Sequence, residues 1–280
     1  MTEIWAHTLV KNEENYIWYA IKSIIDFVDK ILVWDTGSSD KTVEIIQSLK
    51  GEYGSKIDFK ECGNVDIDGY TKLRQEMLNI TSADWFIILD GDEVWWRDSI
   101  KELTEIIRVR YKTLDSVFTR NYNLIGDIYH YQDDAFGKYE IDEIRGHLSV
   151  KAINRHIPGL YTSKPHGQHG YFDKQNILVQ DMHPKRRLFL DRKSFLHFTH
   201  LKRSGGKSDE KVPKRPMKYK YELSNNFPLD FYYPEAFFLK RPNNIRSPWI
   251  EMDIPYKVRA FIDTPLRKVK RRMIYGGTGY

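Results

Sequence analysis

Apolar residues follow two alternating patterns over roughly the first 110 positions of this 280-residue chain. Short apolar runs of strand length occupy residues 4–10, 30–34, 57–60 and 85–89. Between these runs, in residues 17–28, 43–49 and 69–79 and after Asp98, apolar residues recur every three or four positions, which is the spacing of one helix face. Asp98 is expected to cap its helix. Strands that alternate with helices predict an α/β fold with a mostly parallel sheet flanked by helices.

Beyond residue 112 the pattern becomes less regular. Residues 116–122 and 148–154 are strand candidates, while 202–220 are basic and interrupted by glycine and proline, as in a loop or linker. A basic stretch with Pro265 inside it, 257–272, ends the chain. We predict an α/β part at 1–112, a second part of the same domain at 113–201, and an irregular basic C-terminal extension at 202–280.

Charge is divided unevenly between the two halves. Residues 1–143 hold 16 Lys+Arg and 28 Asp+Glu, a net charge of −12, whereas residues 144–280 hold 28 and 11, a net charge of +17. The basic half suits an anionic partner such as nucleic acid, anionic lipid or a phosphorylated substrate; an ordinary solvated surface is the alternative. Cys62 is the only cysteine, which excludes a disulfide framework and a cysteine-based zinc site.

Polar clusters follow three of the predicted strands. They are residues 11–15, 35–40 and 90–93. In a parallel sheet, ligands bind beyond the carboxyl ends of the strands, so these clusters mark the expected site. Asp90 and Asp92 can hold a divalent cation, directly or through water, and such a cation would neutralise a diphosphate.

Three segments carry a resemblance to a known family. They read TLVKNEE at 8–14, VWDTGSSDKT at 33–42 and DWFIILDGDE at 84–93. In this order and spacing the chain resembles family 2 glycosyltransferases of the GT-A fold, which share an N-E-E segment, a D-x-G-S-x-D-x-T turn and a D-x-D. The likeness covers roughly residues 4–110 and implies a nucleotide-sugar donor.

The resemblance also implies roles for residues near the donor. Asn12 and Glu13 would lie near the nucleotide base, and Asp35 and Thr36 near the base and ribose. Many relatives have an aspartate in place of Thr36. Arg74, in the helix before the fourth strand, matches a basic position that approaches the diphosphate; a solvated helix arginine is the alternative.

A metal site follows from the same resemblance. Asp92 would be the main ligand of Mn²⁺ or Mg²⁺, with Asp90 on the ribose or on a metal-bound water. A C-terminal histidine often completes this site in GT-A enzymes, and we expect His200 to do so from a strand at 195–200. His197 would then point to the opposite face of that strand.

Catalytic groups are harder to predict from the sequence. Inverting transfer needs a general base, and among five carboxylates between 133 and 143 we take Asp142 and Glu143 as candidates, with His166 as a further one. His166 could instead orient a phosphate or pack. Lys202 and Arg203 could close over the donor diphosphate; a plain charged loop is the alternative.

These observations predict a metal-dependent glycosyltransferase acting in glycan or glycolipid synthesis. We expect a UDP-sugar donor, with GDP- or dTDP-sugars as alternatives, and a glycan, lipid-linked or phosphorylated acceptor. The chain is expected in the cytoplasm, with peripheral membrane contact and no nucleic-acid partner. The main rival is a non-enzymatic protein that binds nucleic acid or an anionic surface through its basic half. A sugar nucleotidylyltransferase is disfavoured because no glycine-rich loop follows the first strand.

Overall fold

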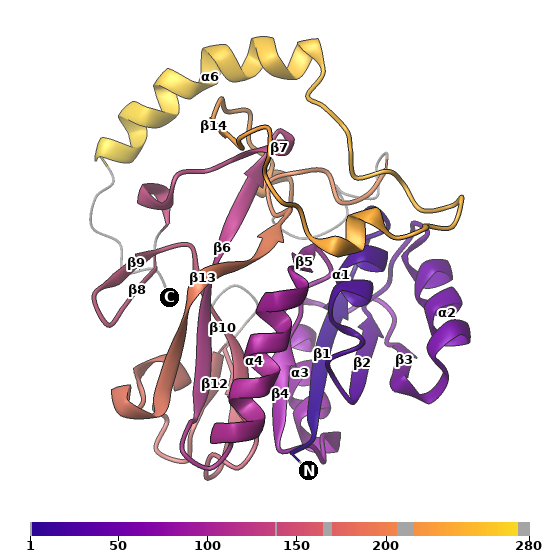
Figure 1. The fold of residues 1–280 in the computed structure, drawn as a ribbon, viewed down its shortest axis with the longest axis vertical. Coiled ribbons are helices and arrows are strands. Elements are labelled where there is room, and N and C mark those ends of the chain that lie inside the picture. Colours follow the sequence, from indigo (N-terminus) through magenta and orange to yellow (C-terminus); the bar gives the residue numbers. More distant parts are fainter. Residues whose placement is uncertain (1, 138, 165–169, 206–214, 274–280) are drawn as a thin grey trace.

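A computed structural model describes residues 2–137, 139–164, 170–205 and 215–273. Within these residues the main sheet has ten strands, in the order β14-β7-β6-β10-β4-β1-β2-β3, with β13 and β5 paired off this path (Figure 1). They are β1 (Ile4–Val10), β2 (Lys30–Asp35), β3 (Ile57–Glu61), β4 (Trp85–Ile88), β5 (Glu93–Trp95), β6 (Ser116–Ile125), β7 (Asp127–Tyr131), β10 (Leu148–Asn154), β13 (Arg187–His197) and β14 (Asn225–Asn226).

The N-terminal strands β3, β2, β1 and β4 are mutually parallel. Their side chains alternate between two cores: Ile31 and Val33 enter the core on one face, whereas Leu32 and Trp34 enter the core on the other. This period of two, with both faces buried, explains why the strands read as continuous apolar runs. The predicted α/β class with a mostly parallel sheet is confirmed.

Helices cover both faces of these strands. The bounds of the helices are α1 (Ile17–Ile24), α2 (Thr42–Tyr53), α3 (Ile67–Ile80), α4 (Arg97–Arg110), α5 (Arg215–Lys218) and α6 (Ile254–Met273). Apolar residues of α1, α2 and α4 join the larger core, and Leu73 and Met77 of α3 join the core on the opposite face. Helix α4 begins at Arg97, so Asp98 lies in its first turn and is not the N-cap residue as expected.

The second half extends the sheet with antiparallel and mixed pairings. Strand β10 lies antiparallel between β4 and β6, and β13 runs parallel to β6 before its end pairs with β5. Two small hairpins lie outside the main sheet, β8 (Tyr139–Ile141) with β9 (Ile144–Gly146) and β11 (Tyr161–Ser163) with β12 (Gly170–Phe172). Of the strand predicted at 195–200, only residues 195–197 are strand: they are the last residues of β13, which ends at His197.

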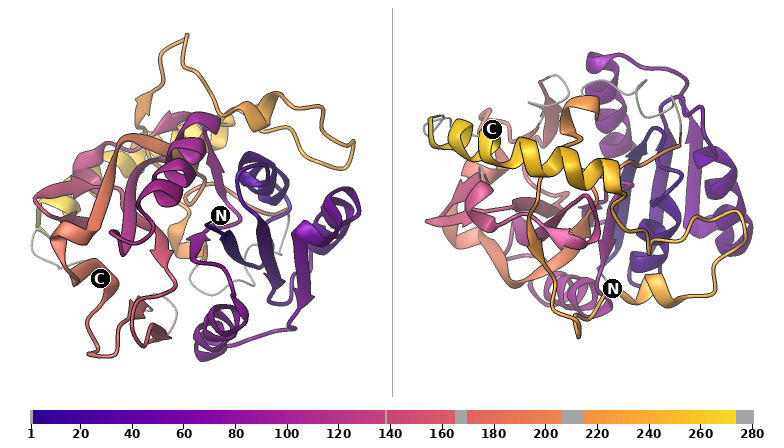
Figure 2. Two further views of the ribbon diagram at one scale, coloured as in Figure 1. Left: turned by 60° about the horizontal axis from the view of Figure 1, so that its bottom comes forward. Right: turned by 90° about the horizontal axis from the view of Figure 1, so that it is seen from above.

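The main sheet draws strands from all three predicted parts of the chain, since β14 lies at Asn225–Asn226. The boundaries at 112 and 201 stay predictions. The basic stretch at 257–272 lies within a single helix, α6, which crosses the upper side of the molecule (Figure 1). Figure 2 shows α6 as the foremost element when the molecule is seen from above.

Candidate active site

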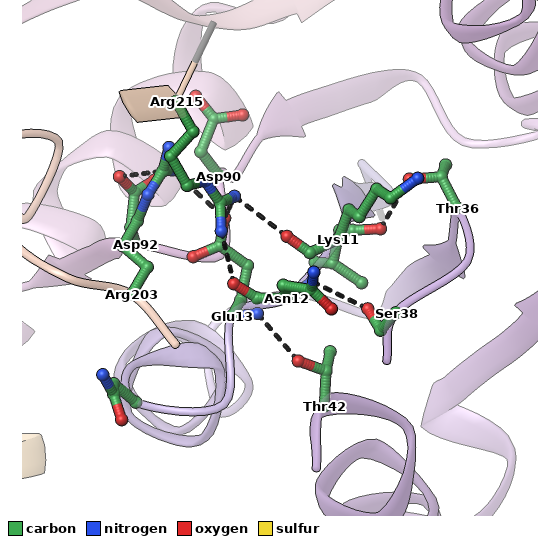
Figure 3. Close-up of polar contacts among 12 residues, drawn as sticks. Lys11, Asn12, Glu13, Thr36, Ser38, Thr42, Asp90, Asp92, Arg203 and Arg215 are labelled. Atoms are coloured by element: carbon green, nitrogen blue, oxygen red, sulfur yellow. Dashed lines mark hydrogen bonds and ion pairs between the residues drawn. The ribbon is translucent and has the colours of Figure 1, made fainter. Parts of the chain in front are cut away.

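Three turns meet at one edge of the parallel sheet. They follow β1, β2 and β4, which are neighbours in the order β4-β1-β2, so their carboxyl ends open on the same side. Figure 3 shows the side chains of these turns facing one another and facing two arginines from the C-terminal half. The structure therefore brings these residues together at the strand ends, as the sequence predicts.

The turn after β1 is locked to the turn after β2. Asn12 has a left-handed backbone (φ 53), a conformation that asparagine tolerates better than most residues. Its N–H donates to Ser38 Oγ (2.8 Å), and its side-chain Oδ1 accepts from the N–H of Ser39 (2.7 Å). The N–H of Glu13 donates to Thr42 Oγ1 (2.7 Å). The N-E-E and D-T-G-S-S-D-K-T segments therefore form one hydrogen-bonded unit.

Asp35 and Thr36 are buried and build the second turn from within. Asp35 Oδ2 accepts from the N–H groups of Gly37 and Ser38, each at 2.9 Å. Thr36 Oγ1 donates to the carbonyl of Val10 (2.9 Å). Gly37 has a φ of 88°, a region that side chains with a Cβ rarely adopt. These side chains fix the shape of the turn.

The third turn carries the D-x-D carboxylates. A Cβ on Gly91 would come within 2.9 Å of Glu13 Cγ, so glycine is needed between the two aspartates for the turns to approach this closely. Asp92 is buried, 1% exposed, and its Oδ2 lies 2.7 Å from Arg203 Nη1 and 3.4 Å from His197 Nε2. Burial disfavours the carboxylate, but Arg203 and His197 outweigh it and hold the pKa of Asp92 well below its usual range.

Glu13 connects the strand ends to the C-terminal half of the chain. Its Oε1 lies 3.1 Å from Arg203 Nη1 and 2.5 Å from Arg215 Nη2. Arg215 also donates to the backbone carbonyls of Lys11 (2.9 Å) and Asn12 (2.5 Å), as Figure 3 shows. Two guanidinium groups thus cover a cluster of acidic and carbonyl oxygens that the N-terminal turns have assembled.

A second buried ion pair lies next to the turn that carries Asp90 and Asp92. Lys151 Nζ, on β10, lies 2.6 Å from both carboxylate oxygens of Glu93, and the two side chains are 3% and 1% exposed. Glu93 Oε2 also accepts from the N–H of Asp90 (3.2 Å). Burial raises the pKa of Glu93 to about 7, and the charge of Lys151 acts in the opposite direction. Through this hydrogen bond to the Asp90 backbone, the Lys151–Glu93 pair helps to hold the turn with Asp90 and Asp92 in position.

Arg74 and Lys202 flank the carboxylates. The Arg74 guanidinium is buried and lies 3.6 Å from Asp90 Oδ1, while the Asp90 side chain is 43% exposed. Lys202 is exposed, and its carbonyl accepts from Asn15 Nδ2 (2.9 Å), which ties residues 202 and 203 to the first turn. The structure therefore brings Arg74 and Arg203 to the carboxylates, with Lys202 at the rim.

His200 makes hydrogen bonds other than the metal contact expected of it. Its Nδ1 lies 2.8 Å from the carbonyl of Lys218 and its Nε2 lies 3.1 Å from Gln132 Oε1, so both ring nitrogens are engaged. Burial, with Lys220 nearby, holds the pKa of His200 well below its usual value. The strand ends at His197, so the alternation used to place the two histidines does not extend to position 200. The structure brings His197 to Asp92, while both ring nitrogens of His200 contact groups other than the motif carboxylates.

The predicted catalytic carboxylates are also remote from these turns. Asp142 and Glu143 form the turn of the β8–β9 hairpin, where both have positive φ, and Asp142 pairs with Arg187 at the start of β13. His197 lies at the other end of that strand. The partners of Arg187 and His197 on β6 are Ser116 and Asn123, so at about 3.3 Å per residue the two ends of β13 lie roughly 20 Å apart. The structure therefore does not bring these carboxylates to the site. His166 lies outside the described residues.

Sequence reasoning missed three residues that contact the motif carboxylates. The alternation of a strand predicts that His197 faces away from the site, Lys151 stands in an ordinary apolar strand, and Arg215 lies in a basic segment without a pattern. A lysine alone in a buried strand is a usable signal, because buried lysines are nearly always paired. No comparable signal marks Arg215 among its basic neighbours.

The fold and the motif turns define the class of protein, and comparison with known families agrees with them. The family model described as "Glycosyl transferase family 2" matches residues 7–174. The chain belongs to this family, and the resemblance seen in the three segments is confirmed.

Comparisons with individual proteins give shorter or more distant matches. A TPR repeat-containing protein of Synechococcus elongatus is 28% identical over 93 residues, 33% of this chain and 21% of that protein. An uncharacterized glycosyltransferase of Rickettsia bellii is 34% identical over 91 residues, 32% and 28% of the two chains. Both matches span under a third of those relatives. Glucosyl-3-phosphoglycerate synthase from Mycobacterium tuberculosis, solved with Mn²⁺, UDP and phosphoglyceric acid, is 15% identical, covers 70% of this chain and 71% of its own, and has a TM-score of 0.47.

The Lys151–Glu93 pair generates a stability prediction. Lys151→Met leaves Glu93 buried without its partner, so we expect the free energy of unfolding to fall by about 3–5 kcal/mol. Urea denaturation followed by circular dichroism measures it. The double variant Lys151→Met/Glu93→Gln removes the buried charge and is expected to recover a large part of the loss. A double variant no more stable than the single one would contradict this electrostatic explanation.

Proposed function

We propose that this protein transfers a sugar from a nucleoside diphosphate sugar to an acceptor hydroxyl, with a divalent cation held at the D-x-D turn. One observation carries the proposal. A buried carboxylate of the motif, Asp92, faces an imidazole and a guanidinium that reach it from residues more than a hundred positions away. Family membership gives the class of reaction, and this convergence supports our proposal that the donor diphosphate binds beside Asp92.

Asp92 and His197 fit Mn²⁺ or Mg²⁺ as part of a ligand set. Asp92 Oδ2 is buried, and in the structure its negative charge is balanced by Arg203 Nη1 at 2.7 Å and by His197 Nε2 at 3.4 Å. Among the described residues no three His, Cys, Asp or Glu side chains converge as a complete metal site. Such cations often use one or two protein ligands and take the rest from substrate phosphates and water. The cation would supply Lewis-acid stabilisation of the leaving diphosphate.

Arg203 has two roles in this proposal. Without substrate it neutralises Asp92 and Glu13, which would otherwise be buried with like charges close together. With the donor present, its guanidinium would leave Asp92 and pair with the diphosphate, together with Arg74 and the exposed Lys202. Positive side chains there stabilise the charge that develops as the sugar leaves.

The remaining donor contacts stay predictions. Asn12, Asp35 and Thr36 hold the two turns together, and we expect them to shape the surface that receives the base and ribose. We likewise propose that the donor is a UDP-sugar and that the reaction inverts the anomeric carbon. For the acceptor we propose a glycan, lipid-linked or phosphorylated molecule. A panel of UDP-, GDP- and dTDP-sugars, scored by nucleotide release with Mn²⁺ or Mg²⁺, identifies the donor.

Asp92→Asn tests the cation site. We expect kcat/KM for donor turnover to fall by about 100-fold or more, because the charge that holds the cation is lost. Metal-dependent donor binding, measured by calorimetry, should be lost as well. Asp98→Asn, an exposed carboxylate in the first turn of α4, is the matched control and should behave as the wild type. Normal metal-dependent binding by Asp92→Asn would contradict the proposal.

The two histidines give a second test. His197→Ala should raise the metal concentration needed for half-maximal activity, by about tenfold or more for a lost ligand. His200→Ala should leave that concentration unchanged and lower thermal stability instead, because its bonds to Gln132 and the Lys218 carbonyl are lost. Metal titrations and melting curves separate these effects. The opposite result would restore His200 as the ligand.

A further inference from the structure

The outer face of α6 is apolar and exposed. Six of its residues are more than half exposed and form what we call the α6 stripe: Ile254 (77%), Val258 (57%), Phe261 (72%), Ile262 (59%), Leu266 (66%) and Val269 (53%). Their spacings of three and four place them on one side of a helix about 30 Å long at 1.5 Å per residue. A continuous apolar stripe of this kind marks an interaction surface.

The opposite side of the helix attaches it to the protein. Tyr256, Ala260 and Thr264 are buried, and the first two pack in a small core with Met252 and with Tyr219 and Tyr221. Tyr256 Oη donates to the carbonyl of Lys220 (2.6 Å), and Thr264 Oγ1 accepts from the N–H of Leu223 (2.8 Å). The apolar stripe is thus the face that α6 turns away from the rest of the protein. No other described element lies above α6 in Figure 1, and α6 is the foremost element in the right view of Figure 2.

Basic residues border the stripe. At 100° per residue, Lys257 falls along one edge and Arg259 along the other, and both are exposed. The one acidic residue within the helix, Asp263, lies 3.7 Å from Arg259 and 3.9 Å from Arg267 and is thereby neutralised. The sequence continues with Lys268, Lys270, Arg271 and Arg272, so this end of the chain is strongly positive.

We propose that α6 is an interfacial helix that docks the protein on an anionic lipid surface. A helix with an exposed apolar stripe and basic edges lies in the plane of a membrane interface. Its apolar side chains are inserted between the lipids, and its basic side chains contact the headgroups. Among the described residues no helix combines the length and apolar character needed to cross a bilayer. A second copy of the chain fits less well, because pairing two such helices would bring their basic edges together.

The position of α6 relative to the candidate site suits this partner. A cavity of about 180 Å³ lies at the start of the helix, lined by Met252 and Tyr256 and also by Lys202 and Asn15 of the site. A lipid surface in contact with the start of α6 would therefore lie close to this cavity and to Lys202. Lipid docking stands independently of the proposed transfer reaction, since it is measured without a sugar donor.

Vesicle co-sedimentation of the full chain tests the proposal. We expect binding to phosphatidylcholine vesicles containing about a third phosphatidylserine, and much weaker binding to pure phosphatidylcholine or at high salt. Phe261→Ser/Ile262→Ser should weaken the partition coefficient by about tenfold or more, since two inserted side chains are lost. Lys257→Ala should weaken it by about fivefold, the value for one basic residue near an anionic surface.

A matched control substitutes exposed apolar residues elsewhere. Val109 and Leu229 are more exposed than any residue of the α6 stripe, and Val109→Ser/Leu229→Ser should bind lipid as the wild type does. Equal binding by wild type and Phe261→Ser/Ile262→Ser would overturn the proposal, as would absence of wild-type binding to anionic vesicles. A dimer in solution that Phe261→Ser/Ile262→Ser dissociates, without lipid binding, would also overturn it in favour of a second copy. Nucleotide release in solution should be unchanged in all these variants, which separates a failure of docking from a failure of the proposed reaction.

Discussion

The neutralisation of buried carboxylates at one sheet edge is the constraint on which the arrangement of the chain depends. Parallel strands bring Glu13, Asp92 and Glu93 together at their carboxyl ends, where burial makes uncompensated charge costly. The compensating cations come from later in the chain: Lys151 from β10, Arg203 after β13, and Arg215 in α5. Folding the N-terminal half into a sheet therefore requires the basic half to complete it. The uneven division of charge along the sequence reflects this internal pairing as well as any external partner.

Much of the fold was predictable because it is encoded locally. The spacing of apolar residues up to residue 110 was enough to predict the α/β class. The three polar turns at strand ends were enough to predict the edge of the sheet at which the candidate site lies. Long-range pairing was not predictable. His197 faces Asp92 because β13 ends there and pairs with β5, which no local pattern reveals. Asp142 and Glu143 had the right chemistry, but they form a distant hairpin turn. Helix α6 was not predicted, because Pro265 and closely spaced basic residues are typical of irregular segments.

The proposed cation and the Arg203 guanidinium would be alternative ways of balancing the buried charge of Asp92. The stronger the ion pair between Arg203 and Asp92, the more of the binding free energy of such a cation would be used to displace the guanidinium, so the two equilibria would be linked. Because Arg203 also contacts Glu13, and the Asn15 side chain donates to the carbonyl of Lys202, displacement is coupled to the first turn. Donor binding and rearrangement of residues 202–205 would then occur together.

The register of β13 has an evolutionary consequence. Its pairing with β6 shifts twice, between Phe189 and Phe195, and then stays regular to His197. A residue gained or lost upstream could be absorbed where the ladder is already irregular. Between Phe195 and His197, however, an insertion or deletion would reverse every side chain, turning the imidazole away from Asp92 and an apolar residue toward it. Length variation among descendants of this chain should therefore accumulate in the first part of the strand and be excluded from its last three residues.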